Sequence, residues 1–219
     1  MTDDPELIPL GCWEIDVPFI LQRTPGRTDL DAPFLGLNYG LPDLQLTADI
    51  PIEVMSKDHD RPAAGVGDFL FGVKWRFFND ENSQLQLGFS PQLLVPTGNR
   101  ARGLGEGQPA FVLPFLVEKS WANWTLYGNV GYWWQTAAET RNYVYAGAVL
   151  EREINERLTL GAELFGNFPQ EQSGGSDVGF NIGGALKVTK HLNLLFSGGR
   201  DIVGDTKAMA YIGLQLLTK

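Results

Sequence analysis

Residues 44–54 read LQLTADIPIEV, and every second residue in this stretch is apolar. The residues between the apolar ones are polar, charged or proline, and they include Asp49 and Glu53. Side chains of a β-strand point alternately to its two faces, so these residues form a strand with one apolar face and one polar face. Residues 69–77, FLFGVKWRF, have the same alternation, with Lys74 between two apolar neighbours.

Two kinds of protein have strands of this type. In a soluble sandwich or barrel the apolar faces meet in a dry core and the polar faces meet water. In a transmembrane β-barrel the apolar faces contact lipid and the polar faces line a lumen. The order of strands and breaks along the chain decides between them.

About twelve such stretches follow one another from Trp13 to the end of the chain, each near the nine to eleven residues of a tilted membrane strand. The fifth stretch is expected to run unbroken from Leu85 to Val95. The breaks after the first, third, fifth, seventh and ninth stretches are expected to be long, and the others short. The long breaks are Arg23–Asp29, Ser56–Gly67, Pro96–Gly107, Gln135–Arg141 and Pro169–Ser176. This alternation predicts an all-β, antiparallel, up-and-down transmembrane barrel with short periplasmic turns and long outer loops.

The composition restricts the remaining classes. The chain has 219 residues, a formal net charge of -9 and one cysteine, Cys12, so nucleic acid is not an expected partner and no internal disulfide can form. No apolar run approaches the ~18 residues of a membrane helix. Residues 1–12 are expected to form a separate N-terminal segment, with no signal peptide in the sequence given, and residues 13–219 a single barrel.

Aromatic residues near the strand ends support a membrane setting, because Trp and Tyr favour the interface between lipid and water. Two girdles are expected. The inner one comprises Trp13, Tyr39, Trp75, Phe77, Trp121 and Trp124, and the outer one Trp133, Trp134, Tyr143, Tyr145 and Phe168.

Several blocks of the sequence resemble one protein family. The most specific are Gly67-Asp68 followed by Gly72-Val73-Lys74-Trp75-Arg76, and Pro96-Thr97-Gly98 after a strand. Further blocks are Asn38-Tyr39-Gly40, Lys119-Ser120-Trp121, Leu158 to Glu163 and Phe196 to Ile202. These blocks are similar to the outer-membrane proteins described as belonging to the MetA pathway of phenol degradation. The resemblance implies export, a bacterial outer-membrane barrel and the passage of small hydrophobic or aromatic compounds.

The polar faces supply the candidate site. A charge facing lipid costs about 2–4 kcal/mol at the midplane, so charged strand residues are expected to point into the lumen. The lumen-lining candidates are Asp49, Glu53, Asp68, Lys74, Arg76, Gln86, Glu118, Asn129, Glu163, Asn181 and Lys187. They make either a selective polar conduit or a network that fills the barrel. Arg200 and Asp201 are expected to form an ion pair at the outer rim.

Catalysis is not expected. The two histidines, His59 and His191, both lie in predicted loops, and His59 is the only candidate for an outer-membrane hydrolase. No metal site or cofactor is indicated.

The sequence therefore predicts a channel or transporter for small molecules, with outer-membrane lipid, a solute and the outer-membrane assembly machinery as partners. Two alternatives remain open at this point: a structural barrel that does not conduct, and a soluble β-barrel that binds an apolar ligand.

Overall fold

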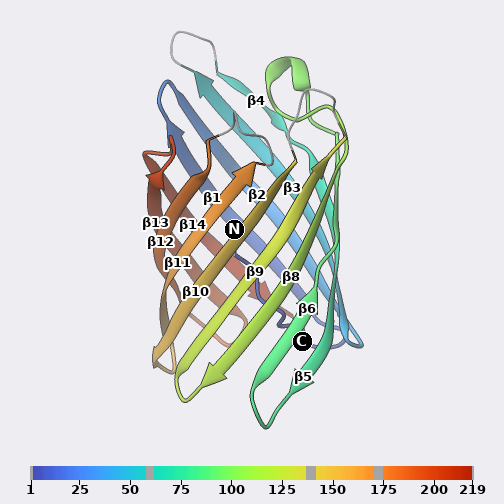
Figure 1. The fold of residues 1–219 in the computed structure, drawn as a ribbon, viewed down its shortest axis with the longest axis vertical. Helices are drawn as coiled ribbons and strands as arrows, with labels where there is room; N and C mark the ends of the chain where they lie inside the picture. Colours follow the sequence, from blue (N-terminus) through green and yellow to red (C-terminus); the bar gives the residue numbers. More distant parts are fainter. Residues whose placement is uncertain (1, 58–61, 137–141, 170–174, 219) are drawn as a thin grey trace.

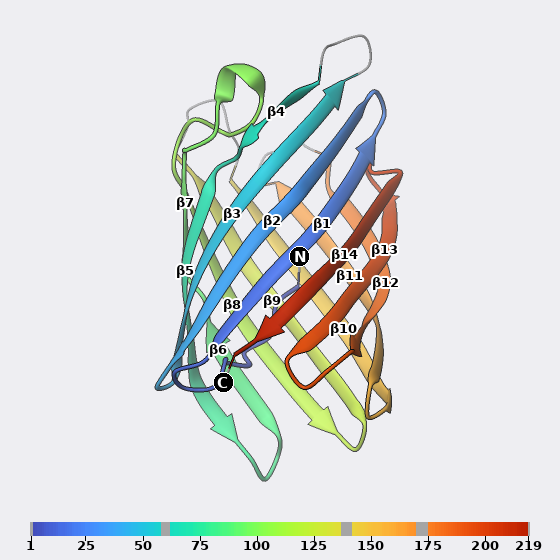
Figure 2. The ribbon, with the colours of Figure 1, turned by 180° about the vertical axis from the view of Figure 1, so that it is seen from behind.

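The computed structural model describes residues 2–57, 62–136, 142–169 and 175–218. The described chain forms a closed antiparallel barrel of twelve wall strands (Figures 1 and 2). The barrel closes because the first strand pairs with the last, with Val17 opposite Leu214. This pairing leaves no open seam between the two ends of the sheet, as a sheet in lipid requires.

The strands follow one another around the wall in sequence order. Their bounds are β1 Trp13–Thr24, β2 Arg27–Leu41, β3 Leu44–Lys57, β4 Ala63–Val66, β5 Phe69–Asp80, β6 Leu85–Phe89, β7 Gln92–Val95, β8 Ala110–Trp121, β9 Trp124–Gln135, β10 Tyr143–Asn155, β11 Leu158–Pro169, β12 Asp177–Lys187, β13 Leu192–Val203 and β14 Ala208–Leu217. In the described residues one three-residue 3-10 helix, η1 (Arg100–Arg102), lies between β7 and β8, and no helix is long and apolar enough to cross a membrane.

Two wall strands are interrupted, which is why fourteen strands make a twelve-strand wall. β4 and β5 both pair with β3, one above the other, and are separated by Gly67 and Asp68. β6 and β7 both pair with β5 and β8, and are separated by Ser90 and Pro91. The expected unbroken strand from Leu85 to Val95 is therefore wrong, because Pro91 has no N–H to donate to the ladder.

The first expected long break is also wrong. β1 and β2 pair as far as Thr24 and Arg27, so only Pro25 and Gly26 remain for the turn. Gly26 has φ +73°, a conformation that glycine adopts without a steric penalty. The outer loops of the barrel are therefore unequal, and the longest described one, from Pro96 to Pro109, carries η1.

The apolar faces point outward. Phe71 is 47% exposed, Val130 52% and Ile182 63%, whereas the inward Lys74 and Glu118 are 7% and 3% exposed. A soluble barrel that hides an apolar core has the opposite arrangement. An apolar band around the wall with charges inside is the arrangement of a barrel in lipid.

Aromatic pairs lie near both ends of the wall, among them Trp13 with Tyr39 and Phe111 with Trp134. Three residues expected in the outer girdle differ. Trp133, Tyr143 and Tyr145 line an interior cavity, because their strand register places them on the lumen side. The alternation of a strand, and not closeness to its end, decides whether a ring meets lipid.

Candidate functional site

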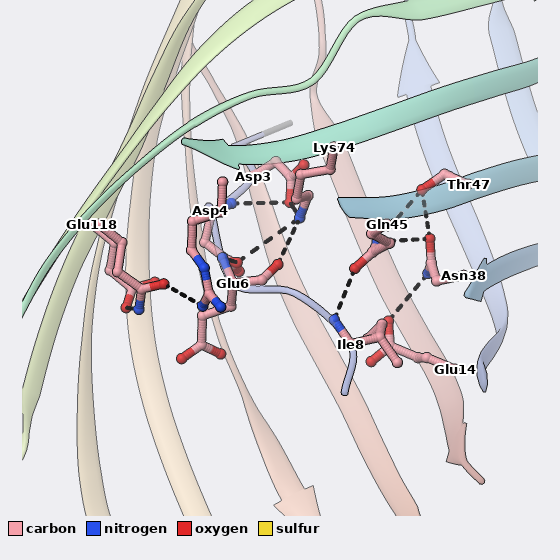
Figure 3. Close-up of polar contacts among 12 residues, drawn as sticks. Asp3, Asp4, Glu6, Ile8, Glu14, Asn38, Gln45, Thr47, Lys74 and Glu118 are labelled. Carbon is pink, nitrogen blue, oxygen red and sulfur yellow. Dashed lines mark hydrogen bonds and ion pairs between the residues drawn. The ribbon is translucent and has the colours of Figure 1, made fainter. Parts of the chain in front are cut away.

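The N-terminal segment, residues 2–12, lies inside the barrel (Figures 1 and 3). From Trp13 at the inner end of β1 it runs back across the lumen. Along this path Gly11 N–H donates to Gly40 O on β2, Ile8 N–H to Gln45 Oε1 on β3, and Thr2 N–H to Glu163 Oε1 on β11. The segment therefore connects opposite walls of the barrel.

Lys74 on β5 is the main charged anchor of this segment. Its Nζ lies 2.9 Å from Asp3 Oδ1 and 3.9 Å from Asp4 Oδ1 (Figure 3). It also donates to the backbone oxygen of Glu6 at 3.5 Å. An ammonium that is almost fully buried requires such partners, because an unpaired charge there is costly. Burial raises the pKa of Asp4 to about 6, although the Lys74 charge opposes this increase.

Inward glycines give the segment room. A Cβ at Gly147 on β10 would collide with the Thr2 side chain, and one at Gly40 would collide with the carbonyl oxygens of Ile8 and Pro9. A Cβ at Gly88 on β6 would lie 3.1 Å from Pro5 Cβ. The local sequence gives no signal for these glycines, because their role depends on a segment more than twenty residues away from each of them.

A polar network supports the segment where it leaves β1. Gln45 Nε2 donates to Asn38 Oδ1 at 3.1 Å, and the Thr47 hydroxyl donates to the same oxygen at 2.8 Å (Figure 3). Asn38 Nδ2 in turn donates to Glu14 Oε1 at 3.1 Å. The network fixes the Gln45 side chain, and its Oε1 accepts the Ile8 N–H.

Five other lumen-lining candidates form two groups. Arg76 donates to Gln86 at 2.9 Å, and Gln86 donates to the buried Glu118 at 3.1 Å. Glu163 accepts from Asn181 Nδ2 at 2.7 Å while it holds Thr2. All five belong to the inward faces of their strands.

The start of the N-terminal segment contributes to the walls of two interior cavities. The larger, of about 680 Å³, is lined by Asp49, Asn129 and the outer halves of several strands, and Thr2 and Asp3 contribute to its wall. The smaller, of about 150 Å³, is lined by Thr2 together with Glu151 and other residues further toward the inner end. Thr2 thus lies between the two spaces.

Asp68 and Glu53 lie near the outer end of the barrel. The Asp68 side chain does not line an open part of the lumen. Its two carboxylate oxygens accept the backbone N–H groups of Gly98 and Glu106 at 2.8 and 2.7 Å. The Thr97 hydroxyl donates to Gly67 O at 2.8 Å. The two most specific sequence blocks, Gly67-Asp68 and Pro96-Thr97-Gly98, therefore meet and hold the loop that carries η1.

The expected ion pair of Arg200 and Asp201 is wrong. Neighbouring residues of a strand point to opposite faces, and the described residues contain no ion pair between these two. Asp201 Oδ2 instead accepts the Thr206 N–H at 2.7 Å. Lys187 lies exposed at the inner end of β12.

His59 lies outside the described residues. Within the described ranges, no group of three or more His, Cys, Asp or Glu side chains is placed to hold a metal ion.

The sequence matches the model of the family described as "Putative MetA-pathway of phenol degradation" over residues 12–210. The chain belongs to this family. No curated protein sequence matches the chain.

Solved structures with the same fold are outer-membrane proteins. The outer membrane channel from Pseudomonas putida F1 has a TM-score of 0.77 at 18% identity, covering 98% of each chain. NanC porin has a TM-score of 0.68 at 8% identity, covering 92% of this chain and 98% of its own. KdgM porin, also solved in complex with disordered oligogalacturonate, has a TM-score of 0.63 at 12% identity, covering 93% and 98%.

The protein is thus an outer-membrane β-barrel of this family, with the fold of known channels and porins. The resemblance noted from the sequence blocks is confirmed. The three structures named above are a channel and two porins.

Proposed function

We propose that the protein passes small molecules across the outer membrane through its lumen, and that the N-terminal segment sets the width of the path. The observation that carries the proposal is the course of residues 2–12, which join β2 and β3 to β11 between the two interior cavities. With the segment in place, Thr2 lies between these two cavities. Displacement of the segment would remove Thr2 from between them and widen the path.

The contacts of the segment suit a movable element. Residues 2–10 have one ion-pair cluster at Lys74, single backbone hydrogen bonds at Ile8 and Thr2, and close packing over glycines, and Gly11 and Cys12 hydrogen-bond with Gly40. None of these contacts belongs to the strand ladder, so the segment can leave while the wall remains closed. The lumen-lining candidates that hold it, Lys74 and Glu163, would then face the solute.

The inward residues that bond to each other form the fixed wall of the proposed path. Arg76, Gln86 and Glu118 are linked along β5, β6 and β8 and do not depend on the segment for that linkage. Family membership and the resemblance to channels support a solute of small size. The hydrophobic or aromatic character of that solute is implied by the family resemblance.

A reversible disulfide tests the proposal. Pro5 Cβ lies 3.1 Å from a Cβ built at Gly88, near the separation of about 3.5–4.5 Å in disulfides. Pro5→Cys and Gly88→Cys, in a Cys12→Ser background, tie the segment to β6. In planar bilayers the oxidised protein should pass little current, and a reductant should restore the current of the Cys12→Ser parent.

Two results of this experiment would contradict the proposal. Equal currents in the oxidised and reduced protein would show that the segment does not control the path. Absence of current even after reduction and in the parent would favour a structural barrel without an open path.

A further inference from the structure

The larger interior cavity is built like a binding site. Its volume of about 680 Å³ falls within the range of about 300–1,000 Å³ that small-molecule sites occupy. It lies in the outer half of the lumen, where a solute arriving from outside meets it before the N-terminal segment. Thr2 and Asp3 contribute to its wall, so a bound molecule would lie next to that segment.

One side of the cavity is aromatic. Tyr145 on β10 pairs with Gly131 on β9, and Phe165 on β11 pairs with Gly179 on β12. A Cβ at either glycine would collide with the ring of its partner, so each ring lies over the neighbouring strand. Rings held in this way turn a π-face toward the lumen.

Two further rings continue this side toward the outer end. Trp133 and Tyr143 stack with ring centroids 5.6 Å apart and an interplanar angle of 11°. Both line the same cavity as Tyr145 and Phe165. The aromatic side therefore spans three adjacent strands, β9 to β11.

The charges of the cavity have one sign. Its lining includes the carboxylates of Asp49 on β3, Asp177 on β12 and Asp201 on β13. No lysine, arginine or histidine is among the described lining residues, and the described ion pairs of the chain involve none of these three carboxylates. A cleft of one sign between low-dielectric walls concentrates the field and attracts the opposite charge.

We propose that this cavity binds organic ammonium ions, which suit both of its sides. A quaternary or protonated amine over the face of an aromatic ring is attracted by the ring quadrupole, and carboxylates add a direct attraction. A solute of equal size that carries a carboxylate would gain neither of these two attractions. The inference rests on the proposed passage of small molecules and names the class of solute that the outer cavity selects.

Calorimetry on the purified full chain in an uncharged maltoside detergent at pH 8 tests the preference. The probes are benzyltrimethylammonium, benzyl alcohol and phenylacetate, which share a ring and differ in charge. Benzyltrimethylammonium should bind on the order of tenfold more tightly than the other two. Equal affinities for the three probes would overturn the inference.

Variants assign the two sides of the site. Asp49→Asn combined with Asp177→Asn should weaken benzyltrimethylammonium binding by about fivefold or more and leave benzyl alcohol unchanged. Tyr145→Leu should weaken binding of the cation by a few fold. Glu151→Gln, a carboxylate of the smaller cavity beyond Thr2, is the matched control and should bind all three probes as the parent does. A preference that survives both the aspartate pair and Tyr145→Leu contradicts the assignment.

Binding and passage are separable in this design. Solute flux measured in liposomes without a preference for the cation in calorimetry would refute the inference and leave the proposed function intact. A preference for the cation without flux of any probe would refute the proposed function and leave the binding site intact.

Discussion

Lys74 contacts three residues of the N-terminal segment, Asp3, Asp4 and Glu6. Its ammonium contacts both Asp3 and Asp4 and is itself almost fully buried. The Asp3 side chain remains 40% exposed, so water screens part of the attraction. The Lys74–Asp3 pair is therefore worth less than a fully buried ion pair.

Replacing Lys74 by methionine should release the segment. We expect docking to weaken by about 2 kcal/mol, below the ~3–5 kcal/mol for breaking a fully buried pair. Single-channel recordings should show more frequent or longer open periods. Lys187→Met, which removes an exposed lysine from the inner end of β12, should behave as the parent, and identical records for the two variants would count against the role of Lys74.

At the residue scale the sequence predicted which charges point inward but not what they contact. The alternation around Lys74 and Glu163 was sufficient to place them on the polar face. Their partners, Asp3 and Thr2, are 71 and 161 residues away in the chain, and no local pattern contains that information. For Arg200 and Asp201 the prediction failed in the opposite way. They are adjacent in the sequence and were expected to pair, but adjacent residues of a strand point to opposite faces.

At the scale of elements, the interrupted strand β4–β5 explains why two sequence blocks are needed together. The break at Gly67 and Asp68 frees the Asp68 carboxylate to accept two backbone N–H groups from the loop after β7. Leu104 of that loop is 1% exposed, so the loop has a small apolar core of its own. The alternation of apolar and polar residues predicted the strands. A break of only two residues between two strands, such as Gly67 and Asp68, gives no clear signal in that alternation.

Asp68→Asn should loosen this loop. An amide replaces one accepting oxygen by an N–H donor that faces the N–H of the loop, at a cost of about 1–3 kcal/mol. Trypsin added to intact cells should cut at Arg100 or Arg102 faster than in the parent. Asp205→Asn, in the loop between β13 and β14, is the control, and equal cleavage in all three proteins would refute the anchoring role.

Gly147 on β10 tests the packing of the segment from the side of the wall. Valine at this position would occupy the space of the Thr2 side chain, so we expect the segment to be displaced and conductance to rise. Gly198→Val, on the outward face of β13 opposite Ile182, is the control for a valine in the wall, because a Cβ there meets nothing closer than 3.7 Å. Heat-modified mobility on gels checks that both barrels fold, and a folded Gly147→Val barrel with parental conductance would contradict the packing model.

At the scale of the whole molecule, the twelve-strand closed barrel follows from alternation repeated along the chain, and it is confirmed. The alternation did not predict what lies inside the lumen. Residues 2–12 have no alternation and enter no strand, so nothing local in them indicates that they lie inside the barrel. The location of the segment is a property of the closed wall and its inward glycines taken together.

Spin labels on β9 test which side of the wall meets lipid. In a Cys12→Ser background, a nitroxide at Val130→Cys should be relaxed mainly by oxygen, which partitions into the bilayer. A nitroxide at the neighbouring Asn129→Cys should be relaxed mainly by a water-soluble nickel chelate. The same accessibility at both positions would contradict the division into a lipid face and a wet face.

The most direct test of the central claim is solute flux through the barrel without its internal segment. Removal of residues 2–10 leaves Gly11 and Cys12, which hydrogen-bond with Gly40, and leaves every strand complete. Proteoliposomes that contain this variant should admit small sugars several-fold faster than those with the full chain. Equal flux through the two barrels, with both shown to be folded, would mean that the N-terminal segment does not close the path.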